Sequence, residues 1–128
     1  MAKSLQNRIT HAVVNLIPKV KLIYLFGSHA SGTASVGSDL DIAILLDCKL
    51  NTVDRWNYAS ELADNLNQSV DFVDLLSAST VMQNEIIHNG ICIYDPQKTA
   101  DKFSMHIMSM YQHLNEERKD ILLQFFAE

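Results

Sequence analysis

Short apolar stretches alternate with segments of helical periodicity along the whole chain. Strand-like runs cover residues 21–26, 39–46, 70–76 and 91–94. Helical patterns cover residues 5–17, a segment that begins at Asn51 or Thr52, a segment that ends at Asn89-Gly90, and residues 97 to the end. This alternation predicts an α/β domain, and 128 residues are expected to form one such domain, 1–128. The pattern leaves open whether neighbouring strands are parallel or antiparallel.

The chain is acidic, with a formal charge of −5 and a pI near 5.4. This balance argues against a broad phosphate-binding surface, so we expect no direct binding of nucleic acid. The N-terminus lacks an apolar signal core, and the longest apolar run, residues 42–46, is too short to cross a membrane. We therefore expect a cytoplasmic protein in which Cys48 and Cys92 are reduced, partly buried thiols.

Three aspartates occupy unusual positions in the predicted strands. Asp39 and Asp41 head the second strand, and Asp71 lies inside the third. Aspartate is disfavoured in strands, and a buried carboxylate has to be paired, protonated or bound to metal. Because side chains alternate across a strand, Asp39 and Asp41 should project from one face, where Asp71 can join them if the two strands are neighbours. Gathered carboxylates repel one another unless cations lie between them, and oxygen ligands suit Mg²⁺ or Mn²⁺.

A fourth aspartate, Asp74, is a weaker candidate. It points to the opposite face of its strand from Asp71. The preferred interpretation is a solvated side chain at the end of the strand.

A glycine and a serine follow the first predicted strand. Gly27 permits close approach of the backbone and unusual dihedral angles, and Ser28 stands where a short helix or turn begins. Backbone N–H groups at such a start favour an anion, and the Ser28 hydroxyl can bind a phosphate oxygen. The Walker pattern is absent, so this is not a P-loop.

These residues form a pattern when they are taken together. Gly27-Ser28, a ten-residue spacer, Asp39-Leu40-Asp41 and the later Asp71 resemble the signature of the DNA polymerase β-like nucleotidyltransferase superfamily. The run from Gly27 to Ala43 is similar to its minimal nucleotidyltransferases. The resemblance implies a small mixed β-sheet flanked by helices, with a C-terminal helix. It also implies that Asp39, Asp41 and Asp71 are catalytic and hold two Mg²⁺ ions, while Gly27 and Ser28 hold the phosphates of ATP.

Minimal nucleotidyltransferases are commonly encoded beside a HEPN-domain ribonuclease and act as its antitoxin. The resemblance therefore implies a Mg²⁺-dependent protein adenylyltransferase that transfers AMP from ATP to a tyrosine hydroxyl of the HEPN toxin. That modification would neutralise the toxin within a hetero-oligomer. Asp71 is expected to help deprotonate the incoming hydroxyl.

One position departs from the pattern of the relatives. Many relatives carry a basic residue where this chain has Ser31. The serine therefore lacks a positive charge that could bind phosphate. We expect His29, Lys19 or Lys21 to be the residues that could compensate.

Two other functions fit the same residues. A small-molecule nucleotidyltransferase of the aminoglycoside-modifying type would need an acceptor pocket, for which the chain has little material. An antitoxin that acts by binding alone would not need three costly carboxylates. A templated polymerase is disfavoured by the negative charge.

The C-terminal helix, about residues 97–126, is the expected partner-binding element. Its apolar face is wide, and the apolar residues after Asp120 need cover from the core or from another protein. Met105, Met108 and Met110 fit either a binding surface or core packing. On the middle helix, Val53 and Trp56 are expected to face the core.

Overall fold

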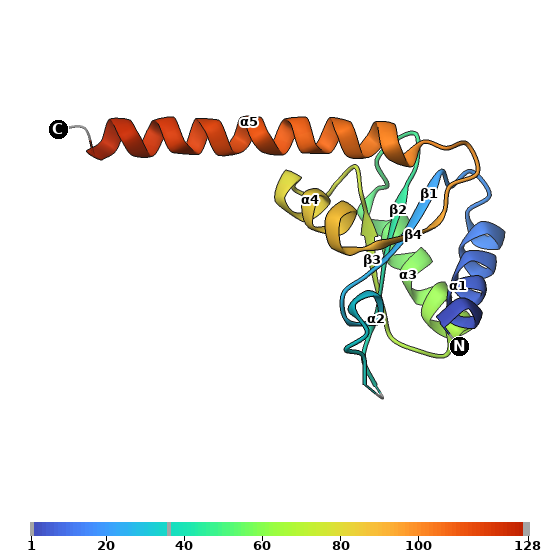
Figure 1. Ribbon diagram of the computed structural model, residues 1–128. Coiled ribbons are helices and arrows are strands. Elements are labelled where there is room, and N and C mark those ends of the chain that lie inside the picture. Colours follow the sequence, from blue (N-terminus) through green and yellow to red (C-terminus); the bar gives the residue numbers. More distant parts are fainter. Residues whose placement is uncertain (1, 36, 127–128) are drawn as a thin grey trace.

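The computed structural model describes residues 2–35 and 37–126, and it alternates helices and strands as the sequence predicts (Figure 1). The described elements are α1 (Ala2–Leu16), β1 (Leu22–Phe26), α2 (Ser28–Ser31), β2 (Leu40–Leu45), α3 (Thr52–Leu66), β3 (Val70–Asp74), α4 (Thr80–Asn89), β4 (Ile91–Tyr94) and α5 (Ala100–Phe126). Most predicted boundaries lie within a few residues of these. Asp39, however, precedes β2 instead of opening it.

The four strands form one mixed sheet in the order β3-β2-β1-β4. β1 is antiparallel to both β2 and β4, whereas β2 and β3 are parallel. β2 is therefore a central strand, and its two neighbours are the strands that precede and follow the acidic pair in the sequence. The sheet thus contains both parallel and antiparallel pairs, a point that the sequence pattern leaves open.

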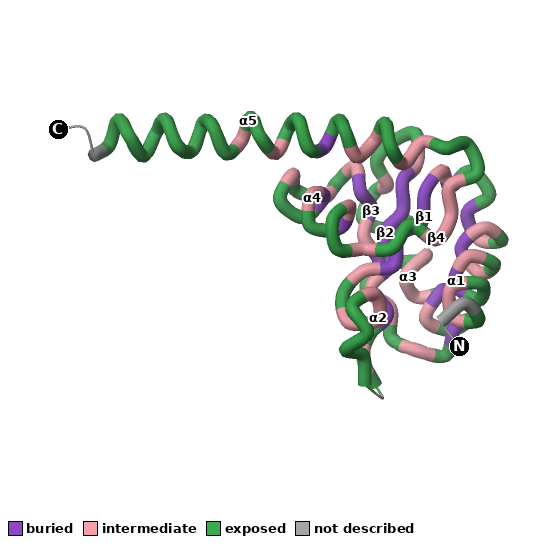
Figure 2. Tube along the Cα trace, viewed as in Figure 1, coloured by how far each residue is buried: buried purple, intermediate pink, exposed green. Residues whose placement is uncertain are grey.

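Helices cover both faces of the sheet and enclose an apolar core on each (Figures 1 and 2). On the α1 and α3 face, alternate strand residues such as Ile23, Ile42 and Ile44 pack against Ile9, Val13 and Leu62. On the α4 face, Tyr24, Ala43 and Leu45 pack with Ile86 and with Phe103 at the start of α5. The period of two along each strand thus assigns every strand side chain to one of two layers.

The second half of α5 extends beyond the rest of the molecule (Figure 2). Ile107 is buried and Leu114 is half-buried, but every side chain from Asn115 to Phe125 is exposed. Ile121, Leu122 and Leu123 are among these exposed side chains. No helix in the described part of the chain has the length and apolarity needed to cross a bilayer.

Two expectations about burial are wrong, and one open alternative is excluded. Val53 and Trp56 are 67% and 69% exposed, because only the part of α3 from Tyr58 onward lies against the sheet. Cys48 lies in the loop after β2 and Cys92 on the edge strand β4, so both thiols are exposed. Met105, Met108 and Met110 are exposed as well, which excludes core packing for them.

Candidate active site

The bend after β1 is shaped by Gly27. Its backbone has φ 70° and ψ −150°, a region that is essentially open to glycine alone. A Cβ atom at this position would overlap the carboxylate of Asp41. Asp41 therefore lies directly against the Gly27 bend, and Ser28 opens α2 immediately beyond it.

Asp41 and Asp71 are brought side by side by the sheet. They are direct partners in the parallel register of β2 and β3, and Phe26 pairs with Asp41 from β1 on the other side. Both carboxylates have the strand parity of Ala43 and Leu45, so they lie on the α4 face of the sheet. Asp41 is half-buried, whereas Asp71 on the edge strand is exposed.

The surroundings of Asp41 oppose its negative charge. Burial raises the pKa of its carboxyl group, and the charge of Asp71, a hydrogen bond between the two carboxyl groups and the charge of Asp39 add to the increase. The positive charge of His29 acts in the opposite direction. A carboxylate in this position is stabilised by a bound cation, and the carboxylates of Asp39, Asp41 and Asp71 offer oxygen ligands, as Mg²⁺ prefers.

Asp39 lies next to this pair but is not fixed by the sheet. It is exposed and precedes β2, yet it is close enough for its charge to act on Asp41. Within residues 2–35 and 37–126, no group of three or more His, Cys, Asp or Glu side chains is gathered closely enough to hold a metal by itself. Mg²⁺ is usually bound through one or two carboxylates together with substrate phosphates, so two converging carboxylates and a nearby third fit that mode.

Two of the three basic residues named from the sequence lie away from the site. Lys19 and Lys21 precede β1, whereas Gly27 follows it, so a whole strand separates them from the bend. Lys21 forms an ion pair with Asp47 at 2.5 Å. The Ser31 and Thr33 hydroxyl groups are hydrogen-bonded to each other, with their oxygens 2.8 Å apart. His29 is therefore the remaining basic residue of that set beside the site.

His29 takes part in a contact that the sequence does not indicate. Gln68 Nε2 donates to the carbonyl oxygen of Ser38 at 2.8 Å, and His29 Nε2 lies 3.4 Å from the same oxygen. Nothing in the local sequence pattern marks Gln68, which lies thirty residues from Ser38, as a contact of that residue. Only the pairing of β2 with β3 brings it there.

The expectation that Asp74 is a solvated side chain at the end of its strand is wrong. It faces away from Asp71, as predicted, but it is 1% exposed. Its carboxylate accepts hydrogen bonds from Leu50 N at 2.8 Å, Leu76 N at 3.2 Å and Ser77 Oγ at 2.8 Å. Asp74 thus fastens the loop before α3 to the end of β3 and does not contribute to the acidic site.

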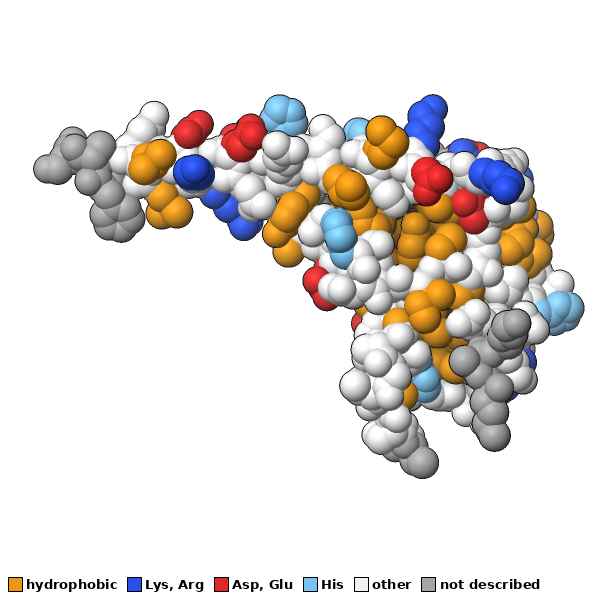
Figure 3. Space-filling model, viewed as in Figure 1, with side chains coloured by type: hydrophobic (Ala, Val, Ile, Leu, Met, Phe, Trp, Pro, Cys, Tyr) orange, Lys and Arg blue, Asp and Glu red, His pale blue; other side chains and the backbone are white. Residues whose placement is uncertain are grey.

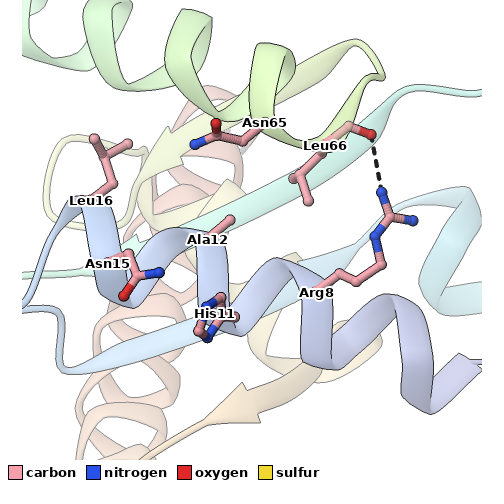
Figure 4. A pocket seen from close by; sticks show the side chains of 7 residues that line it. All are labelled: Arg8, His11, Ala12, Asn15, Leu16, Asn65 and Leu66. Atoms are coloured by element: carbon pink, nitrogen blue, oxygen red, sulfur yellow. Dashed lines mark hydrogen bonds between the residues drawn. The ribbon is translucent and has the colours of Figure 1, made fainter.

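A groove of about 480 Å³ lies between α1 and α3 (Figure 4). It is lined by Arg8, His11, Ala12, Asn15, Leu16, Asn65 and Leu66. Arg8 Nη2 donates to the Leu66 carbonyl at 3.3 Å across it. The helices that form this groove cover the face opposite to Asp41 and Asp71, so the groove is separate from the acidic site.

Comparison with known proteins decides the family. The sequence model of the family described as "Polymerase beta, Nucleotidyltransferase" matches residues 7–99, well over half of the chain. The chain belongs to this nucleotidyltransferase family. The matched segment includes the Gly27 bend and Asp39, Asp41 and Asp71.

Several relatives of this nucleotidyltransferase are similar over most of its length. The protein adenylyltransferase MntA of Shewanella oneidensis is 42% identical, over 91% of this chain and 84% of that protein. A crystal structure of a toxin–antitoxin with AMP-PNP has a TM-score of 0.85 at 41% identity, covering 94% of this chain and 97% of that one. The structure of tri-AMPylated Shewanella oneidensis HEPN toxin in complex with MNT antitoxin has a TM-score of 0.81 at 38% identity, covering 98% of each chain.

Proposed function

We propose that this protein is an antitoxin that transfers AMP from ATP to a tyrosine hydroxyl of a HEPN-domain toxin and thereby neutralises it. The reaction class is supported above all by the pairing of Asp41 with Asp71 against the Gly27 bend. The donor is supported by the related toxin–antitoxin structure with AMP-PNP. The acceptor protein is supported by the relative in complex with a tri-AMPylated HEPN toxin. A reaction that consumes ATP agrees with the cytoplasmic location expected from the sequence.

The chemistry follows from the positions of the carboxylates. Asp39, Asp41 and Asp71 would hold two Mg²⁺ ions, which supply charge neutralisation at the triphosphate and at the attacking and leaving oxygens. Gly27 and Ser28 would hold phosphate oxygens beside Asp41. The acceptor hydroxyl attacks the α-phosphorus in line, the bond to the bridging oxygen breaks, and pyrophosphate leaves. Asp71, exposed on the edge strand, is open to the acceptor and would take its proton.

The C-terminal helix is our candidate for the partner contact, within one nucleotidyltransferase domain of residues 1–128. Exposed hydrophobic side chains lie between α4 and α5 and along the projecting part of α5 (Figure 3). Residues 115–126 extend about 1.5 Å per residue, roughly 18 Å in all. An isolated helix of this length is marginal in water, so a partner that covers it would stabilise it. α4 and α5 lie on the same face of the sheet as Asp41 and Asp71, but α5 is at the other end of the molecule from α2 (Figure 1). A toxin bound along α5 would therefore extend past α4 to reach the acidic site.

Transfer of label from ATP radiolabelled on its α-phosphate tests this function. The wild-type protein is expected to label the cognate HEPN partner in the presence of Mg²⁺. Asp39→Asn combined with Asp41→Asn removes the metal-binding charges, and we expect labelling to fall by at least about 100-fold. Unchanged labelling by the double variant would contradict the assignment. A double variant that labels nothing yet still neutralises the toxin would favour an antitoxin that acts by binding.

A further inference from the structure

Two side chains from distant segments converge on one backbone carbonyl beside the site. Gln68 Nε2 is 2.8 Å and His29 Nε2 is 3.4 Å from the Ser38 carbonyl oxygen, and the two nitrogens are 3.3 Å apart. All three residues are half-buried. We refer to His29, Ser38 and Gln68 as the Ser38 node.

The hydrogen bonds of the Ser38 node do not depend on a single tautomer of His29. A carbonyl only accepts, so the Gln68 amide nitrogen, which carries two hydrogens, is the group that faces Ser38. If His29 Nε2 is unprotonated, it accepts the second hydrogen of Gln68. If His29 Nε2 carries a hydrogen, it donates to the second lone pair of the Ser38 oxygen. The Ser38 carbonyl is therefore held in either case.

The Ser38 node joins the three segments that carry the acidic site. His29 directly follows Ser28, Ser38 directly precedes Asp39, and Gln68 lies three residues before Asp71. The adjacent backbone hydrogen bond from Leu40 N to Ser69 O, at 2.9 Å, continues the connection into the parallel pairing of β2 and β3.

Asp39 needs such a support because the sheet does not hold it. The preceding residues 32–35 and 37 are exposed, and Gly32 and Gly37 both have positive φ. The backbone on either side of Asp39 is fixed at the Ser38 oxygen and at the Leu40 nitrogen. Without the contact to the Ser38 oxygen, this side of Asp39 is held only within its own exposed loop, by the hydrogen bonds from Ser38 N to Ser35 O at 3.0 Å and from Ser35 N to Ser38 Oγ at 2.9 Å.

We propose that Gln68 and His29 are positioning residues for nucleotidyl transfer, which hold the Ser38 carbonyl and thereby fix Asp39 against Asp41 and the Gly27 bend. This inference rests on the proposed function, because it requires Asp39 to act in the transfer of AMP. Gln68 makes the shorter contact and contributes more. His29 makes the longer contact and supports it.

The kinetics of AMP transfer to the HEPN partner test the Ser38 node. Gln68→Met keeps the size of the side chain but removes the donor, and Gln97→Met, on an exposed turn, is the matched control. We expect Gln68→Met to lower kcat by roughly 10- to 100-fold, the order of loss for a displaced catalytic group, with KM for ATP within about threefold of wild type. His29→Leu should lower kcat less, and His29→Gln should recover most of that loss. A kcat for Gln68→Met equal to that of Gln97→Met would overturn the proposal.

A second measurement keeps the inference separate from the proposed function. In NMR spectra of the wild-type protein, the side-chain amide protons of Gln68 should exchange with solvent more slowly than those of Gln97. Equal exchange rates would refute the Ser38 node whether or not AMP is transferred, whereas a wild-type protein with a protected Gln68 that transfers no AMP would refute the proposed function. If Gln68→Met does not fold, His29→Leu compared with His11→Leu provides the same kinetic test.

Discussion

At the scale of single residues, Asp41 is the centre of the site. Its carboxylate fills the space that a side chain at position 27 would need, and it is paired with Asp71 in the sheet. The same contacts that raise the pKa of its carboxyl group make it a ligand in need of a cation. The protein therefore keeps a destabilised carboxylate at the point where phosphate and metal are proposed to bind.

Replacement of Gly27 by alanine tests the close contact with Asp41. An alanine held in the backbone conformation of Gly27 would lower the stability of the folded protein by about 1–3 kcal/mol. Its methyl group would also displace the Asp41 carboxylate. We expect Gly27→Ala to lower AMP transfer by at least about 100-fold. Gly32→Ala is the control, because Gly32 also has positive φ but has open space around it. Gly32→Ala should lose less stability, because its backbone is in the left-handed helical region and no atom crowds the position, and equal activity in the two variants would contradict a role for the contact.

The raised pKa of Asp41 predicts how stability varies with pH. The folded state binds the Asp41 proton more tightly than the unfolded state, so folding loses stability as pH rises from the ordinary to the raised pKa. Without metal, Asp41→Asn should therefore have a higher Tm than the wild type near neutral pH. The difference should shrink as pH falls toward the ordinary carboxyl pKa, and Mg²⁺ should also reduce it. Thermal melts from about pH 4.5 to about pH 7.5, with Asp64→Asn as control, check this. A difference that does not vary with pH would contradict the assigned shift.

Much of the acidic site could be predicted at this scale, and two residues could not. The alternation of side chains correctly indicates that Asp71 and Asp74 face opposite ways. The burial of Asp74 depends on Leu50, twenty-four residues away, whose N–H reaches it only after the loop before α3 folds back. Gln68 likewise has no local mark, because its partner Ser38 lies thirty residues earlier in the chain.

At the scale of elements, the helices show where periodicity is sufficient and where it fails. On α3, Ala59 and Leu66 pack against the core, but the expectation that Val53 and Trp56 do so is wrong, since the first turns of α3 extend past the sheet. Periodicity identifies a face of a helix, but the length of the surface beneath it is set by other elements. The same limit applies to α5, whose exposed half has no core below it.

The projecting half of α5 predicts a separation of stability from binding. Ile121→Ser with Leu122→Ser removes two exposed apolar side chains, which are 64% and 56% exposed. The Tm should change by less than about 2 °C, while affinity for the HEPN partner should fall by at least about tenfold. Val53→Ser with Trp56→Ser, on the opposite face, is the matched control and should leave affinity unchanged. Titration calorimetry measures both variants, and equal affinities would exclude this part of α5 from the interface.

At the scale of the whole molecule, strand order creates the site. β2 lies between β1 and β3, so the bend after β1, the start of β2 and the start of β3 meet at one end of the sheet. A sequence pattern identifies each strand but not its neighbours or their direction, because pairing joins residues far apart in the chain. The family resemblance supplied the mixed sheet, and the register added the direct pairing of Asp41 with Asp71.

The intact mass of the HEPN partner is the most direct test of the proposed reaction. After incubation with this protein, ATP and Mg²⁺, the mass of the partner should rise by whole multiples of the AMP residue, and it should not rise with the Asp39→Asn/Asp41→Asn variant. A partner that is neutralised by the wild-type protein while its mass stays unchanged would contradict catalysis by Asp39, Asp41 and Asp71.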